Sequence, residues 1–201
     1  MKNKVLLFLL IIVLTYSLGG ICYVKIMGGK NKNESVINLE TINNFDYSLK
    51  SNATDLYKEE FNILKANLTS NEINNDEYMK SVSKLFIIDL YTLENKINKY
   101  DVGGVEFVYP NSLDNYKLNV QNTLYKYIED NSNKKRNEDL PVVKYISVEN
   151  VENAKYKMNE TEVDAYNVNL KWEYVNENDY NKEAIVTLIN EESKYYIVEV
   201  K

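Results

Sequence analysis

Three patterns of hydrophobic and polar residues follow one another along the chain. Residues 5–24 contain no charged side chain, residues 51–130 repeat hydrophobic positions every three or four residues, and residues 142–200 alternate hydrophobic with polar positions. The first pattern predicts a membrane-spanning helix, the second amphipathic helices, and the third antiparallel strands with one buried face. Residues 28–50 are polar without a sustained period, and we expect them to form a tether.

The helical region divides into three predicted helices. The first begins after a cap at Ser51 or Asn52, the second covers residues 76–99, and the third covers residues 111–130, just after Pro110. The hydrophobic residues that we expect to face inward are Tyr57, Phe61, Leu64 and Leu68 in the first helix, Met79, Val82, Phe86, Leu90, Leu93 and Ile97 in the second, and Leu113, Val120, Leu124 and Ile128 in the third.

The alternating region predicts an antiparallel meander. In residues 166–174 every second side chain is large and apolar, which is the pattern of a long strand with one buried and one solvated face. A short strand is also expected at residues 105–109, after a turn at Gly103 and Gly104 that needs a positive φ angle. The other expected strands are residues 142–148, 154–158, 184–189 and 195–200, with turns at NVEN, NETE, NENDYN and NEES between them. The fold class is therefore α+β.

This order of elements resembles the NTF2-like (cystatin-like) α+β superfamily over residues 51–201. The resemblance implies a curved antiparallel sheet that wraps helices into a cone. An N-terminal membrane span followed by such a domain is similar to the scaffold subunits of bacterial type IV secretion and Gram-positive conjugation systems. The segment YDVGGVEFVYP also reads like a stretch from uncharacterised exported proteins of low-GC bacteria. These resemblances imply an extracytoplasmic domain that assembles with other proteins.

The composition removes several classes of chemistry. The chain has no histidine and one cysteine, Cys22, so it cannot form a Ser-His-Asp or Cys-His triad, a histidine-ligated metal site or an internal disulfide. Its net charge of −6 argues against a nucleic-acid partner, which requires clustered Lys and Arg. The acidic segment 176–181 lacks the glycine and closing glutamate of a calcium loop. We expect neither a cofactor nor a metal.

The N-terminal segment determines the expected location. We expect residues 1–4 in the cytoplasm, residues 5–27 in the cell membrane as a single-pass anchor in contact with lipid, and residues 51–201 outside as an extracellular domain. The alternative is a signal peptide, because Ser17 and Gly19 put small residues at positions −3 and −1 of a cleavage site. The apolar run continues beyond that site, which favours the anchor.

Aromatic residues of the predicted strands form one candidate site. Either they fill the space between the sheet and the helices, as large aromatic side chains in a core do, or they line a pocket for an apolar or sugar ligand. The residues that we expect on the concave side of the sheet are Tyr145, Tyr156, Tyr166, Trp172, Tyr174 and Tyr196.

Asp89 is the candidate carboxylate, because it lies close to the apolar stripe of the second predicted helix. If it is partly buried, its pKa rises, and with a nearby tyrosine it resembles the acid–base pair of NTF2-like isomerases. If it lies at the edge of the stripe, it faces solvent or a lysine instead.

The expected function is that of a membrane-anchored, extracytoplasmic scaffold without catalytic activity, whose partners are other envelope proteins or a second copy of the chain. Tyr125 and Tyr127 of the third predicted helix cannot both face inward, and exposed tyrosines are favoured at protein interfaces. We therefore take this pair as the candidate interface. The alternative function is a small-ligand-binding or isomerase-like cone that uses the aromatic residues with Asp89.

Overall fold

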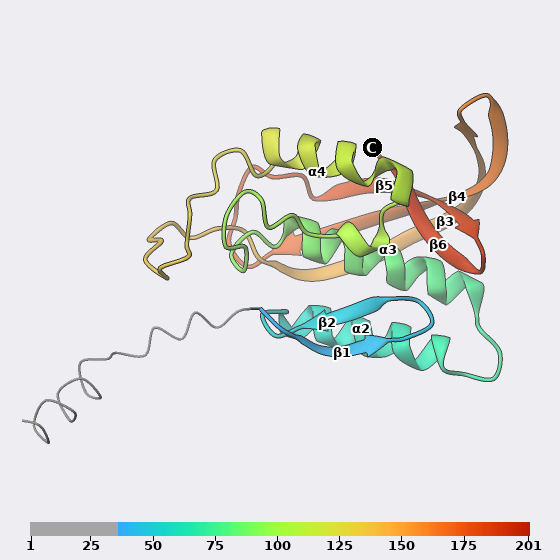
Figure 1. The fold of residues 1–201 in the computed structure, drawn as a ribbon, viewed down its shortest axis with the longest axis horizontal. Coiled ribbons are helices and arrows are strands. Elements are labelled where there is room, and N and C mark those ends of the chain that lie inside the picture. The colour runs from blue at the N-terminus through green and yellow to red at the C-terminus, as the bar shows by residue number, and fades with distance from the viewer. Residues whose placement is uncertain (1–35) are drawn as a thin grey trace, which may run out of the picture. The chain divides into compact units, whose positions relative to one another are not determined.

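The computed structural model describes residues 36–201. Its main feature is a four-stranded antiparallel sheet with helices on one face (Figure 1). The strands are β3 (Val143–Met158), β4 (Thr161–Tyr174), β5 (Glu183–Glu191) and β6 (Lys194–Val200), in the order β3-β4-β5-β6. Helix α3 (Asn75–Tyr91) lies against this sheet. The α+β class predicted from the sequence is confirmed.

Two of the helices begin at polar caps and bury the faces that their hydrophobic period predicts. In α2 (Asp55–Leu68) the side chain of Thr54 accepts a hydrogen bond from the Tyr57 N–H, so the cap lies after Ser51 and Asn52. In α3 the side chain of Asn74 accepts from the Glu77 N–H. All four residues predicted to face inward from α2 are buried, as are Met79, Val82, Phe86 and Leu90 of α3.

Helix α3 ends at Tyr91, eight residues before its predicted end. The chain leaves the helix because Thr92 is extended and the Leu93 N–H donates to the Pro141 carbonyl, which ties the loop to the start of β3. Leu93 is still buried, but Ile97 is exposed on the loop. Leu93 is buried although it lies beyond the helix, so it extended the helical spacing of hydrophobic residues in the sequence and made the predicted helix too long.

The prediction of a strand at residues 105–109 is wrong, because Val105–Phe107 form a short 3₁₀ helix, η1. Gly104 precedes it with φ = 74°, the positive φ that the turn was expected to need. Val108 makes one isolated parallel bridge to Ile197. A second 3₁₀ turn, η2 (Pro110–Ser112), leads into α4 (Leu113–Asn122), which is shorter than predicted.

The segment expected to be a tether is folded from residue 38 onward. Strands β1 (Asn38–Ile42) and β2 (Tyr47–Lys50) pair as an antiparallel hairpin. Ile42, Tyr47 and Leu49 are buried in the main core. The described compact unit is Val36–Lys201, so the domain begins about fifteen residues before the boundary at residue 51 that the polar composition suggested.

Strand β3 runs without the turn that was predicted at residues 150–153. Its pairing with β4 shifts by one residue between Val148 and Asn150, which is a β-bulge. The bulge interrupts the alternation of hydrophobic and polar residues without ending the strand. Beyond the pair Ala165 and Ile189, β3 and β4 pair only with each other, and this part of the hairpin projects from the sheet (Figure 1).

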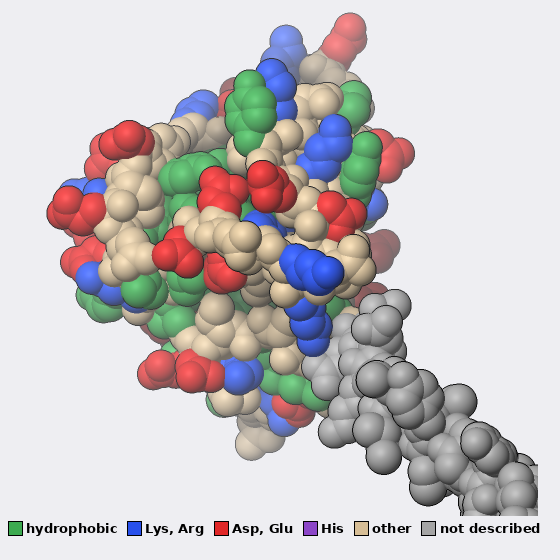
Figure 2. Space-filling view, turned by 90° about the vertical axis from the view of Figure 1, so that its left-hand side faces the viewer, with side chains coloured by type: hydrophobic (Ala, Val, Ile, Leu, Met, Phe, Trp, Pro, Cys, Tyr) green, Lys and Arg blue, Asp and Glu red, His purple; other side chains and the backbone are tan. Residues whose placement is uncertain are grey.

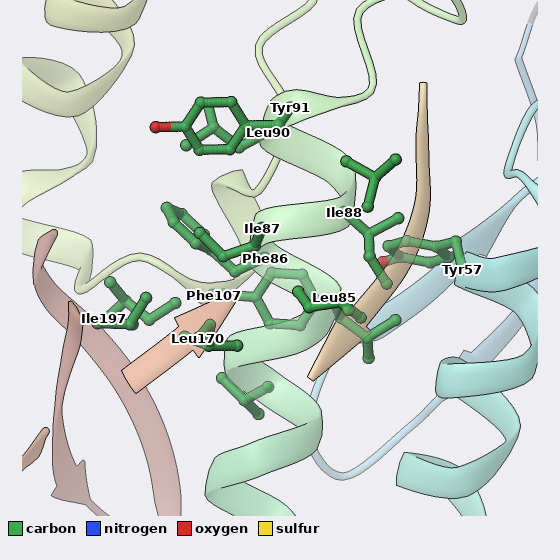
Figure 3. Packing of buried hydrophobic residues seen from close by; sticks show 14 of the residues in the cluster. Tyr57, Leu85, Phe86, Ile87, Ile88, Leu90, Tyr91, Phe107, Leu170 and Ile197 are labelled. Carbon is green, nitrogen blue, oxygen red and sulfur yellow. The ribbon is translucent and has the colours of Figure 1, made fainter. Parts of the chain in front are cut away.

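The core lies between the sheet and α2, and α3 runs through it. Ile88 lies on the side of α3 toward Tyr57 of α2, and Ile87 lies on the opposite side, toward Ile197 of β6 (Figure 3). A helix that is buried on both sides is hydrophobic nearly all round, which explains the run Leu85, Phe86, Ile87 and Ile88.

Within residues 36–201, none of the helices combines the length and the apolar character that crossing a bilayer requires. The predicted membrane segment 5–27, its alternative cleavage site and the first part of the expected tether lie outside the described residues.

Candidate functional site

Three of the predicted aromatic residues, Trp172, Tyr174 and Tyr166, fill the inner face of the sheet. The side chain of Trp172 is 2% exposed, and its ring lies 4.8 Å from that of Tyr91 between centroids. Tyr174 is buried, and its hydroxyl donates to the Asn181 carbonyl. Tyr166 is partly buried and contacts the buried Tyr195 edge-on. Of the two alternatives, these side chains therefore form part of the core, and they do not line an enclosed pocket.

Three of the six aromatic residues expected on the concave side lie on the other face of the sheet. Ile146 is opposite Trp172 and shares its face, so its neighbour Tyr145 points outward and is 55% exposed. Tyr196 pairs with Ile189 on the outer face, while Tyr195 takes the inward position. Tyr156, opposite Val163, also belongs to the outer-face cluster. One residue of register separates the two faces, and the sequence pattern did not determine it.

Asp89 is buried, and its charge is compensated on several sides. Its carboxylate pairs with Lys96, accepts a hydrogen bond of 2.7 Å from the Gly104 N–H, and lies 3.9 Å from the Lys50 ammonium. Burial alone raises the pKa of Asp89, but the charges of Lys96 and Lys50 and the two hydrogen bonds bring it below its ordinary value. Asp89 is thus buried, as the acid–base interpretation required, but its pKa is not raised. It faces lysines, as the other interpretation expected, although not from an edge position.

Glu106 is a second carboxylate of this region, and sequence reasoning missed it. One carboxylate oxygen accepts from the Ser48 N–H at 3.0 Å, and the other accepts from the Tyr57 hydroxyl at 3.0 Å. Burial raises the pKa of Glu106 to about 7, although both hydrogen bonds favour the charged form. No sequence signal identifies Glu106, because it stands in a segment that read as a strand.

These carboxylates bind the β1–β2 hairpin to the rest of the domain. Ser48 and Lys50 belong to β2, whereas Asp89 belongs to α3 and Glu106 to η1. The cavity beside Lys50, Asp89 and Tyr57 has a volume of only about 10 Å³, roughly the space of one water molecule. A small organic substrate does not fit there, so the network holds the hairpin in place and has no room to bind a ligand.

An open groove of about 1180 Å³ lies on the outer face of the sheet. Tyr145 is its exposed aromatic side chain, and Lys171 and Glu149 form an ion pair of 3.6 Å along it. The polar positions that alternate with the buried ones had predicted a solvated face, but nothing in the sequence indicated a groove. The side chains from the strands and the following loop that line it include Tyr145, Ser147, Glu149, Asn169, Lys171, Glu173, Asp179 and Lys182.

A small apolar cluster lies elsewhere on the same outer face. Tyr109, Ala165 and Ile189 are buried at its centre, and the rings of Tyr109 and Tyr196 meet edge-on at 5.9 Å. The partly buried residues around them are Ala154, Tyr156, Met158, Val163, Tyr196 and Val198. Tyr and Met side chains are enriched at protein interfaces. The outer face therefore combines a charged groove with an apolar patch.

The two tyrosines predicted for the interface have different roles. Tyr125 is fully buried, and its hydroxyl donates to the Leu90 carbonyl at 2.7 Å. Tyr127 is 80% exposed. As expected, the pair does not face inward together, and only Tyr127 is accessible to a partner.

Within the part of the chain that the structure describes, no group of three or more acidic or cysteine side chains is placed to hold a metal ion. Comparison of the chain with protein-family models, with curated proteins and with solved structures found no match.

Proposed function

We propose that this protein is a membrane-anchored, extracytoplasmic interaction domain that binds another envelope protein, or a second copy of itself, through the outer face of its sheet. The observation that carries the proposal is the groove of about 1180 Å³ beside Tyr145. Small-molecule sites are enclosed and mostly apolar, whereas this groove is open and lined by side chains of both charges. Protein interfaces combine such a polar rim with exposed aromatic residues.

The anchor and the fold type are part of the same proposal. The uncharged run at residues 5–24 is long enough to cross a bilayer. Lysines lie on both sides of this run, so the count of positive charges does not set its direction. The four leading residues are easily left in the cytosol, which favours an N-terminus inside the cell. A long antiparallel meander with helices against one face is consistent with an NTF2-like cone. In that fold the helices occupy the concave side of the sheet, which leaves the convex side for partners.

The alternative, a ligand-binding or isomerase-like cone, has less support. It needs space beside Trp172 on the inner face, and Trp172 is packed against Tyr91. It also needs a proton-accepting carboxylate with access to substrate, and Asp89 is buried in ion pairs with Lys96 and Lys50. We therefore place the function on the outer face.

Site-specific photocrosslinking tests this proposal in cells that express the full-length protein. A benzophenone amino acid replaces Ser147 in the groove, and the control replaces Glu59, which is exposed on α2. We expect a discrete crosslinked product from position 147 but not from position 59, and we expect Lys171→Glu to reduce it several-fold by reversing a charge in the groove. Equal products from both positions, or a product that is insensitive to Lys171→Glu, would contradict an outer-face interface.

A further inference from the structure

The chain enters the described domain at one end, beside two loops that are far away in sequence. The Ser51 N–H donates to the Ile37 carbonyl at 2.8 Å, and the side chains of Asn52 and Asn95 each donate to the other residue's carbonyl. The Asn131 N–H donates to the Ile97 carbonyl at 2.7 Å. We call this surface, formed by residues 36–37, 94–101 and 126–139, the tether end.

The tether end exposes large hydrophobic side chains. Tyr100 is 68% exposed and Tyr127 is 80% exposed. Each ring has a lysine ammonium over it, from Lys99 at 5.1 Å and from Lys126 at 5.0 Å. Ile37 and Ile97 are also exposed at this end. Tyrosines and lysines are the side chains that suit the boundary between water and lipid, because each has an apolar body and a polar tip.

The tether end is also nearly neutral in an acidic domain. Residues 36–201 carry 19 basic and 29 acidic side chains, a net charge of −10. Residues 94–101 and 126–139 carry six basic and six acidic side chains, and the adjoining residues 175–179 add two acidic ones. Figure 2 looks onto this side of the domain, where basic, acidic and hydrophobic side chains are interspersed. The tether end with these adjoining residues thus carries only −2 of the domain's net charge of −10, which limits its repulsion from an anionic bilayer.

The length of chain before the domain keeps this end near the membrane. Residues 25–35 connect the uncharged run to the domain. Eleven residues span about 40 Å at most, at full extension. A domain of this size has a radius of gyration of about 15 Å. Such a short connection raises the local concentration of lipid, so even weak contacts with the surface are populated.

We propose that the tether end lies on the lipid headgroup surface, with Tyr100 and Tyr127 in the interface. This inference rests on the anchoring part of the proposed function. It adds an orientation, because lipid then covers the tether end, while the outer sheet face remains a separate surface.

Headgroup quenching in vesicles tests the orientation. The full-length Cys22→Ser protein is reconstituted in phosphatidylethanolamine and phosphatidylglycerol vesicles that contain a headgroup spin-labelled lipid. A fluorophore is attached at Asn133→Cys in the tether end, or at Glu160→Cys in the turn of the projecting β3–β4 hairpin; both positions are exposed. We expect quenching at position 133 to exceed quenching at position 160 several-fold.

Substitutions of exposed tyrosines test the cause. Tyr100→Ser with Tyr127→Ser is expected to reduce quenching at position 133 at least twofold, whereas Tyr145→Ser, at an exposed tyrosine of the outer face, leaves it unchanged. Equal quenching at both labels, or no effect of the double substitution, would overturn the orientation while the protein still floats with the vesicles. Failure of the protein to float would overturn the anchor as well. The photocrosslinking experiment at position 147 tests the outer-face interface separately, because its crosslinked product does not depend on the lipid contact.

Discussion

At the scale of single residues, Asp89 and Glu106 illustrate how environment decides the behaviour of a carboxylate. Both lie under the β1–β2 hairpin, but Asp89 has two lysines nearby and Glu106 has two neutral hydrogen-bond donors. Their pKa values accordingly shift in opposite directions. The two carboxylates therefore affect stability in different pH ranges.

Replacing Asp89 by Asn is expected to destabilise the domain by about 3–5 kcal/mol, because the buried Lys96 ammonium loses its partner. Urea denaturation at pH 7 measures the free energy of unfolding. The matched control is Asp55→Asn, since Asp55 pairs with Lys58 on the surface, where water screens the interaction and the pair contributes little to stability. Equal stability of the two variants would show that the buried pair is not formed.

Glu106 is expected to make the domain more stable at mildly acidic pH. Its pKa is about 7 in the folded state against an ordinary value of 4.5, so the folded protein binds the extra proton between these values. The stabilisation is complete below about pH 4.5 and is lost as the pH rises through 7. The pKa of Asp89 is lowered below 3.8, so its contribution changes only under more acidic conditions.

The contribution of Glu106 is isolated by measuring the free energy of unfolding at pH 5 and at pH 8, both for the unchanged protein and for Glu106→Gln. We expect the free energy of unfolding of the unchanged protein to fall by about 1–3 kcal/mol more than that of the variant. Parallel pH profiles for the two proteins would mean that Glu106 has an ordinary pKa in the folded state.

At the scale of elements, the sequence predicts the features that depend only on the spacing of hydrophobic residues within one segment. The inward faces of α2 and of most of α3, and the strands at residues 166–174 and 184–200, follow from their 3.6- and 2-residue periods. Features that depend on distant contacts could not be predicted. Leu93 extends the apparent period of α3 although it lies in a loop held by Pro141, and the bulge at Val148 and Asn150 imitates a turn.

The candidate site was predictable only in part, for the same reason. The burial of Trp172 and Tyr174 follows from alternation within one strand. The outward position of Tyr145 depends on the pairing of β3 with β4, and the partners of Asp89 come from separate elements. Neither can be read from one segment.

The β1–β2 hairpin is expected to be an essential element of the domain. A chain that lacks residues 1–35 should melt within a few degrees of the full-length protein, because the compact unit begins at Val36. A chain that lacks residues 1–50 loses three buried side chains, Ile42, Tyr47 and Leu49. Each contributes about 1.5–3 kcal/mol, and the total approaches the stability of a typical domain.

Thermal unfolding followed by circular dichroism compares these truncations. We expect the shorter deletion to unfold cooperatively and the longer one to unfold without a cooperative transition or to aggregate. If the two truncated chains melted alike, residues 36–50 would be a tether after all.

At the scale of the whole molecule, the proposals assign separate surfaces to separate tasks. The inner sheet face forms the core, the outer face is proposed to bind a protein partner, and the tether end is proposed to contact lipid. Both proposals require that residues 5–27 remain attached to the domain. This attachment is the central claim of the account.

The intact mass and location of the protein recovered from its own cells test this claim most directly. We expect a membrane-bound chain whose mass includes residues 1–27 and which detergent, but not high salt, releases. A chain that begins near Gly20 and is recovered from the culture medium would contradict the anchor, and the protein would then be a secreted, diffusible binder.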